Sequence, residues 1–210
     1  MYRAPQLYTF LEHCEATPLP KEILECGAGG WPGFVPLFAR FADRGFAVHG
    51  IEISEERLGY ARTYCAEHGI DADLRVGDMC ELPYPDGAIP FLFSYNAIFH
   101  MPKADIARVL AEIKRVLAPG GHCFVNFASV DDDRYGEGAE RGPGEFEQRE
   151  GDELTFHSFY DVGEADALFD GLVIDHVERR VLTRRFEDGL FTQGYIDYIA
   201  RVPTDEAPKL

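Results

Sequence analysis

Short runs rich in β-branched and aromatic residues alternate with helical patterns from residue 21 to residue 129, and this alternation constrains the fold most. The runs that predict strands are residues 21–27, 46–53, 71–78, 88–96 and 122–129. Strands separated by helices of about 10–15 residues are typical of repeated βαβ units, which build a parallel sheet with helices on both faces. Right-handed crossovers bring the carboxyl ends of these strands to one edge, where open α/β sheets bind ligands.

Three helical patterns lie between the predicted strands. Residues 34–44 carry apolar side chains at helical spacing, and we expect a helix there to begin near Pro32, because proline is tolerated in a first turn. Ser54 is a predicted N-cap of a second helix that runs to about His68. Residues 104–117 have one continuous apolar stripe and predict the clearest amphipathic helix.

The pattern changes after the fifth predicted strand. Residues 131–152 are rich in Gly, Asp and Glu and predict a long excursion that leaves the ligand-binding edge. A short helix is expected at 161–169, and residues 171–186 and 193–203 predict two long strands. The polar turn between these two strands is expected around Glu187, Asp188 and Gly189. We therefore expect a single domain over residues 1–210, in which a C-terminal hairpin closes an otherwise parallel sheet.

Composition narrows the class of partner. The chain has 37 acidic and 20 basic residues, so its net charge of −17 would repel a phosphate backbone and argues against a nucleic-acid partner. No stretch approaches the roughly 20 apolar residues of a membrane helix, and the first residues lack a leader pattern, so we expect a cytoplasmic protein that makes no membrane contact. The five cysteines show no metal-binding spacing, and the acidic run at 131–133 is interpreted as a solvated turn rather than a metal site. The sequence gives no indication of oligomeric state.

Three polar segments fall at the ends of consecutive predicted strands. The first is the glycine-rich segment 25–30, which begins with Glu25; the second is Glu52; and the third is the Gly77–Met79 segment, which contains Asp78. Glycines let a backbone approach a ligand closely, because they carry no Cβ atom. A carboxylate after the second strand can accept two hydrogen bonds from a ribose diol, and one after the third can accept from an adenine amino group. These segments predict a site for a nucleoside joined to an amino acid.

These segments resemble the motifs of the class I methyltransferases that depend on S-adenosylmethionine (SAM). ILECGAGG (23–30) resembles their motif I, VHGIEIS (48–54) their acidic second strand, and GDMCELPYPDG (77–87) their adenine-binding segment. The resemblance covers about residues 21–128 and is strongest to the small-molecule branch typified by the methyltransferases of ubiquinone and menaquinone biosynthesis. It implies a Rossmann-like α/β fold with a seven-stranded, mostly parallel sheet and an antiparallel C-terminal hairpin strand, with helices on both faces.

The resemblance also implies SAM as cofactor and a role for each matching residue. In the family, the glycine loop passes under the methionine part of SAM, and here that loop contains Gly27, Ala28 and Gly29. Glu25 would order the loop near the methionine amino group, and Tyr8, on a helix expected within residues 1–20, would reach the carboxylate.

The adenosine half of the cofactor would lie against the next two strand ends. Glu52 would bind both ribose hydroxyls, and Ile53 would pack on adenine. Asp78 would accept from the adenine amine, while the Met79 amide would donate to the ring. Tyr95, at the end of the fourth strand, would line the floor near the sulfonium.

The chain departs from the family pattern at two places. Trp31, followed by Pro32, stands where the third glycine of motif I is usual, so we expect the loop to turn differently, with the tryptophan over the pocket. Pro90 and Phe91 stand where an aromatic residue followed by Asp is usual, which predicts a loosely paired beginning of the fourth strand.

Two histidines are candidate catalytic bases. His100 follows the fourth strand and His157 follows the excursion, and an imidazole can deprotonate a hydroxyl, amine or thiol near neutral pH. We expect the excursion over the acceptor site at residues 130–157. Aromatic residues in and around it could form an apolar acceptor pocket: Phe99, Tyr135, Phe146, Phe156, Phe159 and Tyr160. Packing alone also explains these side chains. The hypothesis favoured by the sequence is methyl transfer to an unidentified small molecule; the alternatives are a non-catalytic SAM-binding regulatory or partner protein, and a nicotinamide-dependent oxidoreductase.

Overall fold

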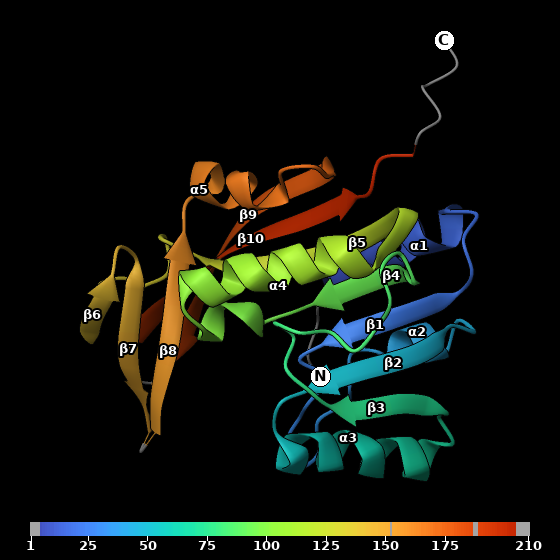
Figure 1. The fold of residues 1–210 in the computed structure, drawn as a ribbon. Helices are drawn as coiled ribbons and strands as arrows, with labels where there is room; N and C mark the ends of the chain where they lie inside the picture. Colours follow the sequence, from blue (N-terminus) through green and yellow to red (C-terminus); the bar gives the residue numbers. More distant parts are fainter. Residues whose placement is uncertain (1–4, 152, 187–188, 205–210) are drawn as a thin grey trace.

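The computed structural model describes residues 5–151, 153–186 and 189–204 (Figure 1). The helices are α1 (Pro5–Ala16), α2 (Ala39–Ala42), α3 (Glu55–His68), α4 (Lys103–Val116) and α5 (Val162–Asp166), with single 3₁₀ turns at Ile98–His100 and Ala167–Phe169. The strands are β1 (Glu22–Cys26), β2 (Ala47–Glu52), β3 (Ala72–Val76), β4 (Ile89–Ser94), β5 (Leu117–Ser129), β6 (Ala139–Gly142), β7 (Glu145–Glu150), β8 (Glu153–Tyr160), β9 (Val173–Phe186) and β10 (Gly189–Arg201).

Seven strands form the main sheet in the order β3-β2-β1-β4-β5-β10-β9. The pairs from β3 to β5 are parallel, whereas β10 runs antiparallel to both β5 and β9. The predicted parallel sheet with an antiparallel C-terminal hairpin strand is therefore confirmed. Of the turn expected in this hairpin, Glu187 and Asp188 lie outside the described residues.

Helices pack on both faces of this sheet and bury two hydrophobic clusters. One lies under α4 and α5 and contains the apolar stripe of α4, which includes Ile106, Leu110 and Ile113. The other lies under α1 and α2 and is largely aromatic; in it Phe41 stacks on Phe93 with ring centroids 5.2 Å apart. Figure 1 shows α4 crossing one face of β4 and β5. In the described part of the chain, no helix is both long enough and apolar enough to span a membrane.

The helix between β2 and β3 follows the local sequence signals. Ser54 Oγ accepts a hydrogen bond from the Arg57 backbone N–H at 3.2 Å, as an N-cap residue does. Gly69 ends α3 in the left-handed region, at φ 67°. Both predicted ends of this helix are confirmed, and the N-terminal end lies directly beside Glu52.

The helix expected at residues 34–44 is much shorter than predicted. Only Ala39–Ala42 form α2, and the chain between Gly27 and Phe38 is an open turn. Pro36 has no N–H to donate and disfavours helical geometry at Val35, while Gly33 has φ 78°. Apolar spacing alone therefore gave a wrong helix boundary, and the structure has a wide loop after β1 instead.

The excursion after β5 contains three strands that the composition did not predict. β6, β7 and β8 form an antiparallel unit, and β8 joins the main sheet through two parallel pairs with the end of β5. The polar composition of the excursion did not indicate strands, because one face of this antiparallel unit is exposed. Phe146 and Gln148 of β7 are nevertheless buried. Gln148 Nε2 donates to the carbonyl oxygens of Arg134 and Glu137, which fixes the loop that leads into β6.

The acidic run that precedes β6 anchors this unit, which corrects its interpretation as a solvated turn. Asp131 pairs with Arg179 of β9. Asp132 is buried, accepts from Arg134 at 3.0 Å, and also accepts from the backbone N–H of Gly194 in β10. The carboxylates thus tie the excursion to the C-terminal hairpin.

Two glycines in this segment provide a matched test of the packing. Both Gly138 and Gly136 have positive φ, but a Cβ at Gly138 would lie 2.3 Å from the Glu147 carbonyl oxygen, whereas one at Gly136 meets nothing. We expect Gly138→Ala to destabilise the protein by about 2–4 kcal/mol and Gly136→Ala by only about 1 kcal/mol, measured by urea unfolding. Equal losses would show that β6 and β7 do not pack as described.

Candidate functional site

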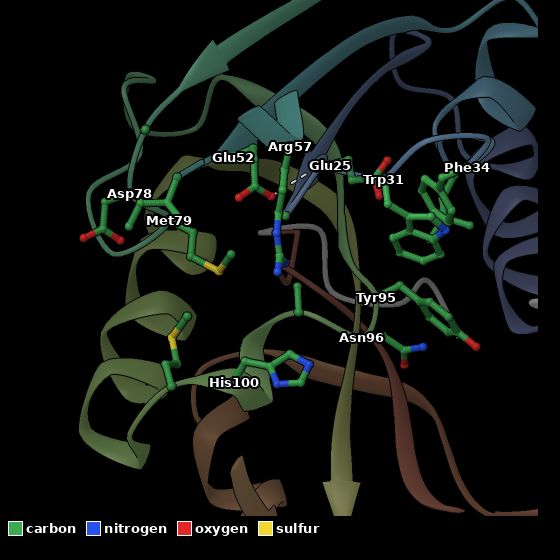
Figure 2. A pocket seen from close by; sticks show the side chains of 18 of the residues that line it. Glu25, Trp31, Phe34, Glu52, Arg57, Asp78, Met79, Tyr95, Asn96 and His100 are labelled. Carbon is green, nitrogen blue, oxygen red and sulfur yellow. Dashed lines mark hydrogen bonds between the residues drawn. The ribbon is translucent and has the colours of Figure 1, made fainter. Parts of the chain in front are cut away.

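A cavity of about 440 Å³ opens at the carboxyl edge of the main sheet (Figure 2). Its walls come from the ends of β1, β2, β3 and β4, from the first turn of α3, and from β8. The lining residues are Glu25, Gly27, Gly29, Gly30, Trp31, Phe34, Leu37, Glu52, Ile53, Arg57, Gly77, Asp78, Met79, Tyr95, Asn96, Ala97, His100, Met101, Glu153 and Thr155. The three polar segments noted in the sequence thus meet in one cavity.

Glu52 ends β2 and connects the glycine loop to α3. Its Oε2 accepts from the Gly29 N–H at 3.1 Å, and its Oε1 accepts from the Ser54 N–H at 3.0 Å. Each carboxylate oxygen keeps further acceptor capacity, so a diol can still bind. A Cβ at Gly29 would lie 2.5 Å from Glu52 Oε2, and this close approach explains the glycine.

Asp78 lies in the cavity wall on the opposite side of Glu52 from Trp31 and Phe34, as Figure 2 shows. Its Oδ1 accepts from the Cys80 N–H at 2.8 Å, which orients the carboxylate. Met79 and the exposed Ile53 line the same part of the cavity. An apolar wall with one oriented carboxylate suits a purine ring whose amino group donates a hydrogen bond.

Glu25 is buried at the end of β1 and lines the cavity. Its Oε2 accepts from the Phe38 N–H at 3.0 Å and so holds the beginning of the short helix α2. Burial raises the pKa of this carboxyl to about 8, although the hydrogen bond from Phe38 opposes the shift. Glu25 is therefore largely protonated at neutral pH in the ligand-free protein.

Aromatic rings form another part of the wall. Trp31, which replaces the third motif glycine, is 57% exposed and packs on Phe34 with ring centroids 4.2 Å apart. Tyr95, at the end of β4, lies nearby and stacks on Phe124 beneath it. The loop begins at Gly27 with φ 87°, a left-handed conformation that glycine adopts without strain.

Sequence reasoning did not identify several of the lining residues. Asn96 is the one residue other than glycine with positive φ among the described residues, at 54°. Asn126, which is fully buried, accepts from the Asn96 N–H at 2.6 Å and donates to Asn96 Oδ1 at 2.7 Å. Strained backbone of this kind is concentrated at functional sites. The sequence signal was only an asparagine at a strand end.

The two candidate catalytic histidines have different environments. His100 lines the cavity, whereas His157 is fully buried behind it, with the two ring centroids 4.7 Å apart. Burial, followed by His100 and Arg134, lowers the pKa of His157 to about 3. His157 therefore remains neutral at physiological pH and does not face the cavity.

Two residues that the resemblance placed at the cofactor do not line the cavity. Tyr8 is 51% exposed on α1, and its ring lies beside the Arg40 guanidinium. Ala28 is buried, and a Cβ at Gly50 would lie 2.7 Å from its own. The sequence does not show where the side chains of Tyr8 and Ala28 point, because their orientation on α1 and in the glycine loop depends on tertiary packing.

Most of the aromatic residues suggested for an acceptor pocket are core residues instead. Phe146 and Phe159 are buried with Phe99 in a small cluster beneath the excursion. Tyr160 belongs to the cluster under α4. From the excursion, the cavity receives Glu153 and Thr155 of β8.

The parallel sheet with its antiparallel hairpin strand, and the glycine loop with acidic residues near it at the carboxyl edge, are the features that the resemblance to class I methyltransferases implies. A model of a methyltransferase domain matches residues 23–121. This match covers slightly less than half of the chain, and over this part the chain is similar to SAM-dependent methyltransferases that act on small molecules. The residues at the cavity fit SAM, because the oriented carboxylates of Asp78 and Glu52 line it in sequence beside a bare glycine backbone.

Comparison with known proteins agrees with this assignment. The chain is 35% identical over 114 residues to a dimethylglycine N-methyltransferase of Parasynechococcus marenigrum, covering 52% of this chain and 39% of that protein. It is 31% identical over 109 residues to a demethylmenaquinone methyltransferase of Thermus thermophilus, covering 50% of this chain and 46% of that protein. The chain spans less than half the length of these relatives.

A solved structure matches over almost the whole chain. A SAM-dependent methyltransferase from Methanosarcina mazei superposes with a TM-score of 0.76 and 21% identity, covering 98% of this chain and 100% of that chain. At this identity the likeness establishes the fold alone.

Burial of Glu25 predicts a pH-dependent stability. Because its folded pKa is raised, the folded state keeps a proton that the unfolded state releases, so stability falls as pH rises from about 4.5 to about 8. We expect Glu25→Gln to gain about 1–3 kcal/mol relative to the wild type between pH 5 and pH 8, measured by urea unfolding without ligand. The exposed control Glu55→Gln should show no such trend, and a parallel pH dependence of Glu25→Gln and wild type would contradict the assignment.

Proposed function

We propose that this chain transfers the methyl group of SAM to a small-molecule acceptor. The observation that supports this most directly is that Glu52 and Asp78 line one cavity, with Glu52 between Asp78 and the bare glycine loop. When bound, SAM supplies a methyl group on a sulfonium, and the leaving group is a neutral thioether. The protein then needs chiefly to hold the acceptor in line, which raises the effective concentration of the reacting groups.

Each cofactor-binding residue has a role that its local geometry supports. Glu52 would accept from both ribose hydroxyls, and Asp78 would accept from the adenine amine. Ile53 and Met79 would pack against the base, with the Met79 N–H donating to it. Gly27 and Gly29 would let the methionine part lie against the backbone, with Tyr95 near the sulfonium.

The acceptor would occupy the part of the cavity that faces away from the adenosine half. There β4 ends in Tyr95 and Asn96, and His100 follows. The segment 130–157, which extends from the same single domain, would cover this part, because Glu153 and Thr155 of β8 line it. A cavity of about 440 Å³ and a net charge of −17 favour a small molecule over a nucleic acid, and we expect it to be methylated in the cytoplasm.

His100 is our candidate for the base that removes a proton from a hydroxyl or thiol acceptor. It lines the cavity, and the neutral His157 ring packs against it from behind. With its pKa lowered to about 3 and no exposure to the cavity, His157 would support the orientation of His100 rather than accept the proton itself.

Calorimetry with SAM and with its product S-adenosylhomocysteine (SAH) tests the cofactor site. We expect Glu52→Ala to weaken SAH binding by about 1–3 kcal/mol, since two ribose hydrogen bonds are lost. Glu55→Ala, three residues away on the outer side of α3, is the control and should bind normally. Unchanged affinity in Glu52→Ala would show that the ribose lies elsewhere, and tight nicotinamide binding in place of SAH would exclude the proposed function.

Turnover of an acceptor panel, followed by mass spectrometry, tests catalysis. We expect His100→Ala to reduce the methylation of hydroxyl acceptors about 100-fold without changing SAH affinity. An amine acceptor that is already deprotonated should be affected much less, and the surface variant His68→Ala should behave as wild type. SAM binding without methylation of any compound would instead support a non-catalytic SAM-binding protein.

A further inference from the structure

The charges around the cavity are strongly unequal. Four carboxyl groups line it, from Glu25, Glu52, Asp78 and Glu153, whereas in the described part of the chain Arg57 is the only lining lysine or arginine. The chain as a whole is also acidic, so its composition does not account for the one arginine among these four acidic residues. Its position is therefore informative about the charge of the ligand.

The stem of Arg57 is held against the glycine loop. Its carbonyl oxygen accepts from the Gly30 N–H at 3.1 Å, and a Cβ at Gly29 would lie 2.8 Å from the Arg57 Cβ. The same added Cβ would also meet the Glu52 carboxylate, so Gly29 lies between these two side chains. Arg57 thus lies in the first turn of α3, against the glycine loop over which the proposed ligand lies and beside the proposed ribose site.

Figure 2 shows the Arg57 side chain extending past Glu52 into the cavity, toward the side where His100 lies. Within the described residues its guanidinium makes no ion pair or hydrogen bond, although the exposed Arg62, five residues further along α3, bonds to Glu55 and to the Leu74 carbonyl oxygen. Arg57 therefore reaches into the cavity without being neutralised there by a neighbouring carboxylate.

The ligand expected here has one anionic group. SAM and SAH carry a carboxylate on the methionine part, while their amino group and the sulfonium of SAM are cationic. Tyr8, the residue expected at this carboxylate, does not line the cavity. An arginine offers a planar fork of N–H donors that matches a carboxylate.

Building on the proposed function, we propose that Arg57 binds the carboxylate of the methionine part of SAM. The guanidinium folds over the ligand from the first turn of α3, while Glu52 holds the ribose from the other side of Gly29. Arg57 then distinguishes SAM and SAH from adenosyl compounds that lack the carboxylate.

A cycle of two ligands and two proteins tests this directly. The ligands are SAH and its decarboxylated analogue S-adenosyl-3-thiopropylamine, and the proteins are wild type and Arg57→Met, which keeps the apolar stem on Gly29. We expect wild type to prefer SAH by about tenfold in calorimetry, and Arg57→Met to bind both ligands almost equally. Because Arg57 is exposed, the wild-type preference should shrink as NaCl is raised, and that of Arg57→Met should not.

Two controls separate this contact from general effects. Arg62→Met removes the same charge from the same helix outside the cavity and should keep the tenfold preference. Arg57→Lys keeps the positive charge but lacks the planar fork of N–H donors, so it should retain part of the preference for SAH. An undiminished preference for SAH in Arg57→Met would overturn the proposal and would leave an acceptor carboxylate as the partner of Arg57. Absence of SAH binding to the wild-type protein would instead overturn the proposed function itself.

Discussion

The carboxylate of Glu52 is the interaction on which the arrangement of the site depends. With one oxygen it holds the glycine loop after β1, and with the other it holds the beginning of α3. Two consecutive βα connections are thereby joined at the carboxyl edge of the sheet. Because the same carboxylate would bind the ribose, the group that shapes the cavity is also the group that would recognise its ligand.

The two halves of the cavity have different origins in the chain. The adenosine half is built by β1, β2, β3 and the first turn of α3, all within the matched residues 23–121. The half proposed for the acceptor is also lined by β8, which lies beyond that match. β8 is held by its pairing with β5 and by the Asp132 carboxylate, which ties the excursion to β10. On the proposed function, acceptor specificity would therefore depend in part on β8, which lies beyond the residues that the methyltransferase domain model matches.

The sequence predicted those features that depend on local chemistry. The main strands and the helix between Ser54 and Gly69 follow from apolar runs and cap residues, and Glu52 and Asp78 reach one cavity because strand ends share an edge. The features that the sequence could not predict depend on tertiary contacts. One is β7, a polar segment in which Phe146 and Gln148 are buried. Likewise, the direction of Tyr8 and the αL conformation of Asn96 are set by partners that are distant in sequence.

The shortened helix α2 changes what Glu25 can do. Pro36 delays the helix to Ala39, so the Phe38 N–H needs an acceptor, and the buried Glu25 carboxyl supplies it. Burial raises the pKa of this carboxyl to about 8, so on the proposed function it would act as a hydrogen-bond partner of the methionine amino group more than as its counterion. The carboxylate at that end of the ligand would be matched by Arg57, which lies across Gly29 from Glu52. The loop that carries Trp31 and the first turn of α3 that carries Arg57 are thus joined, because the Gly30 N–H donates to the Arg57 carbonyl oxygen.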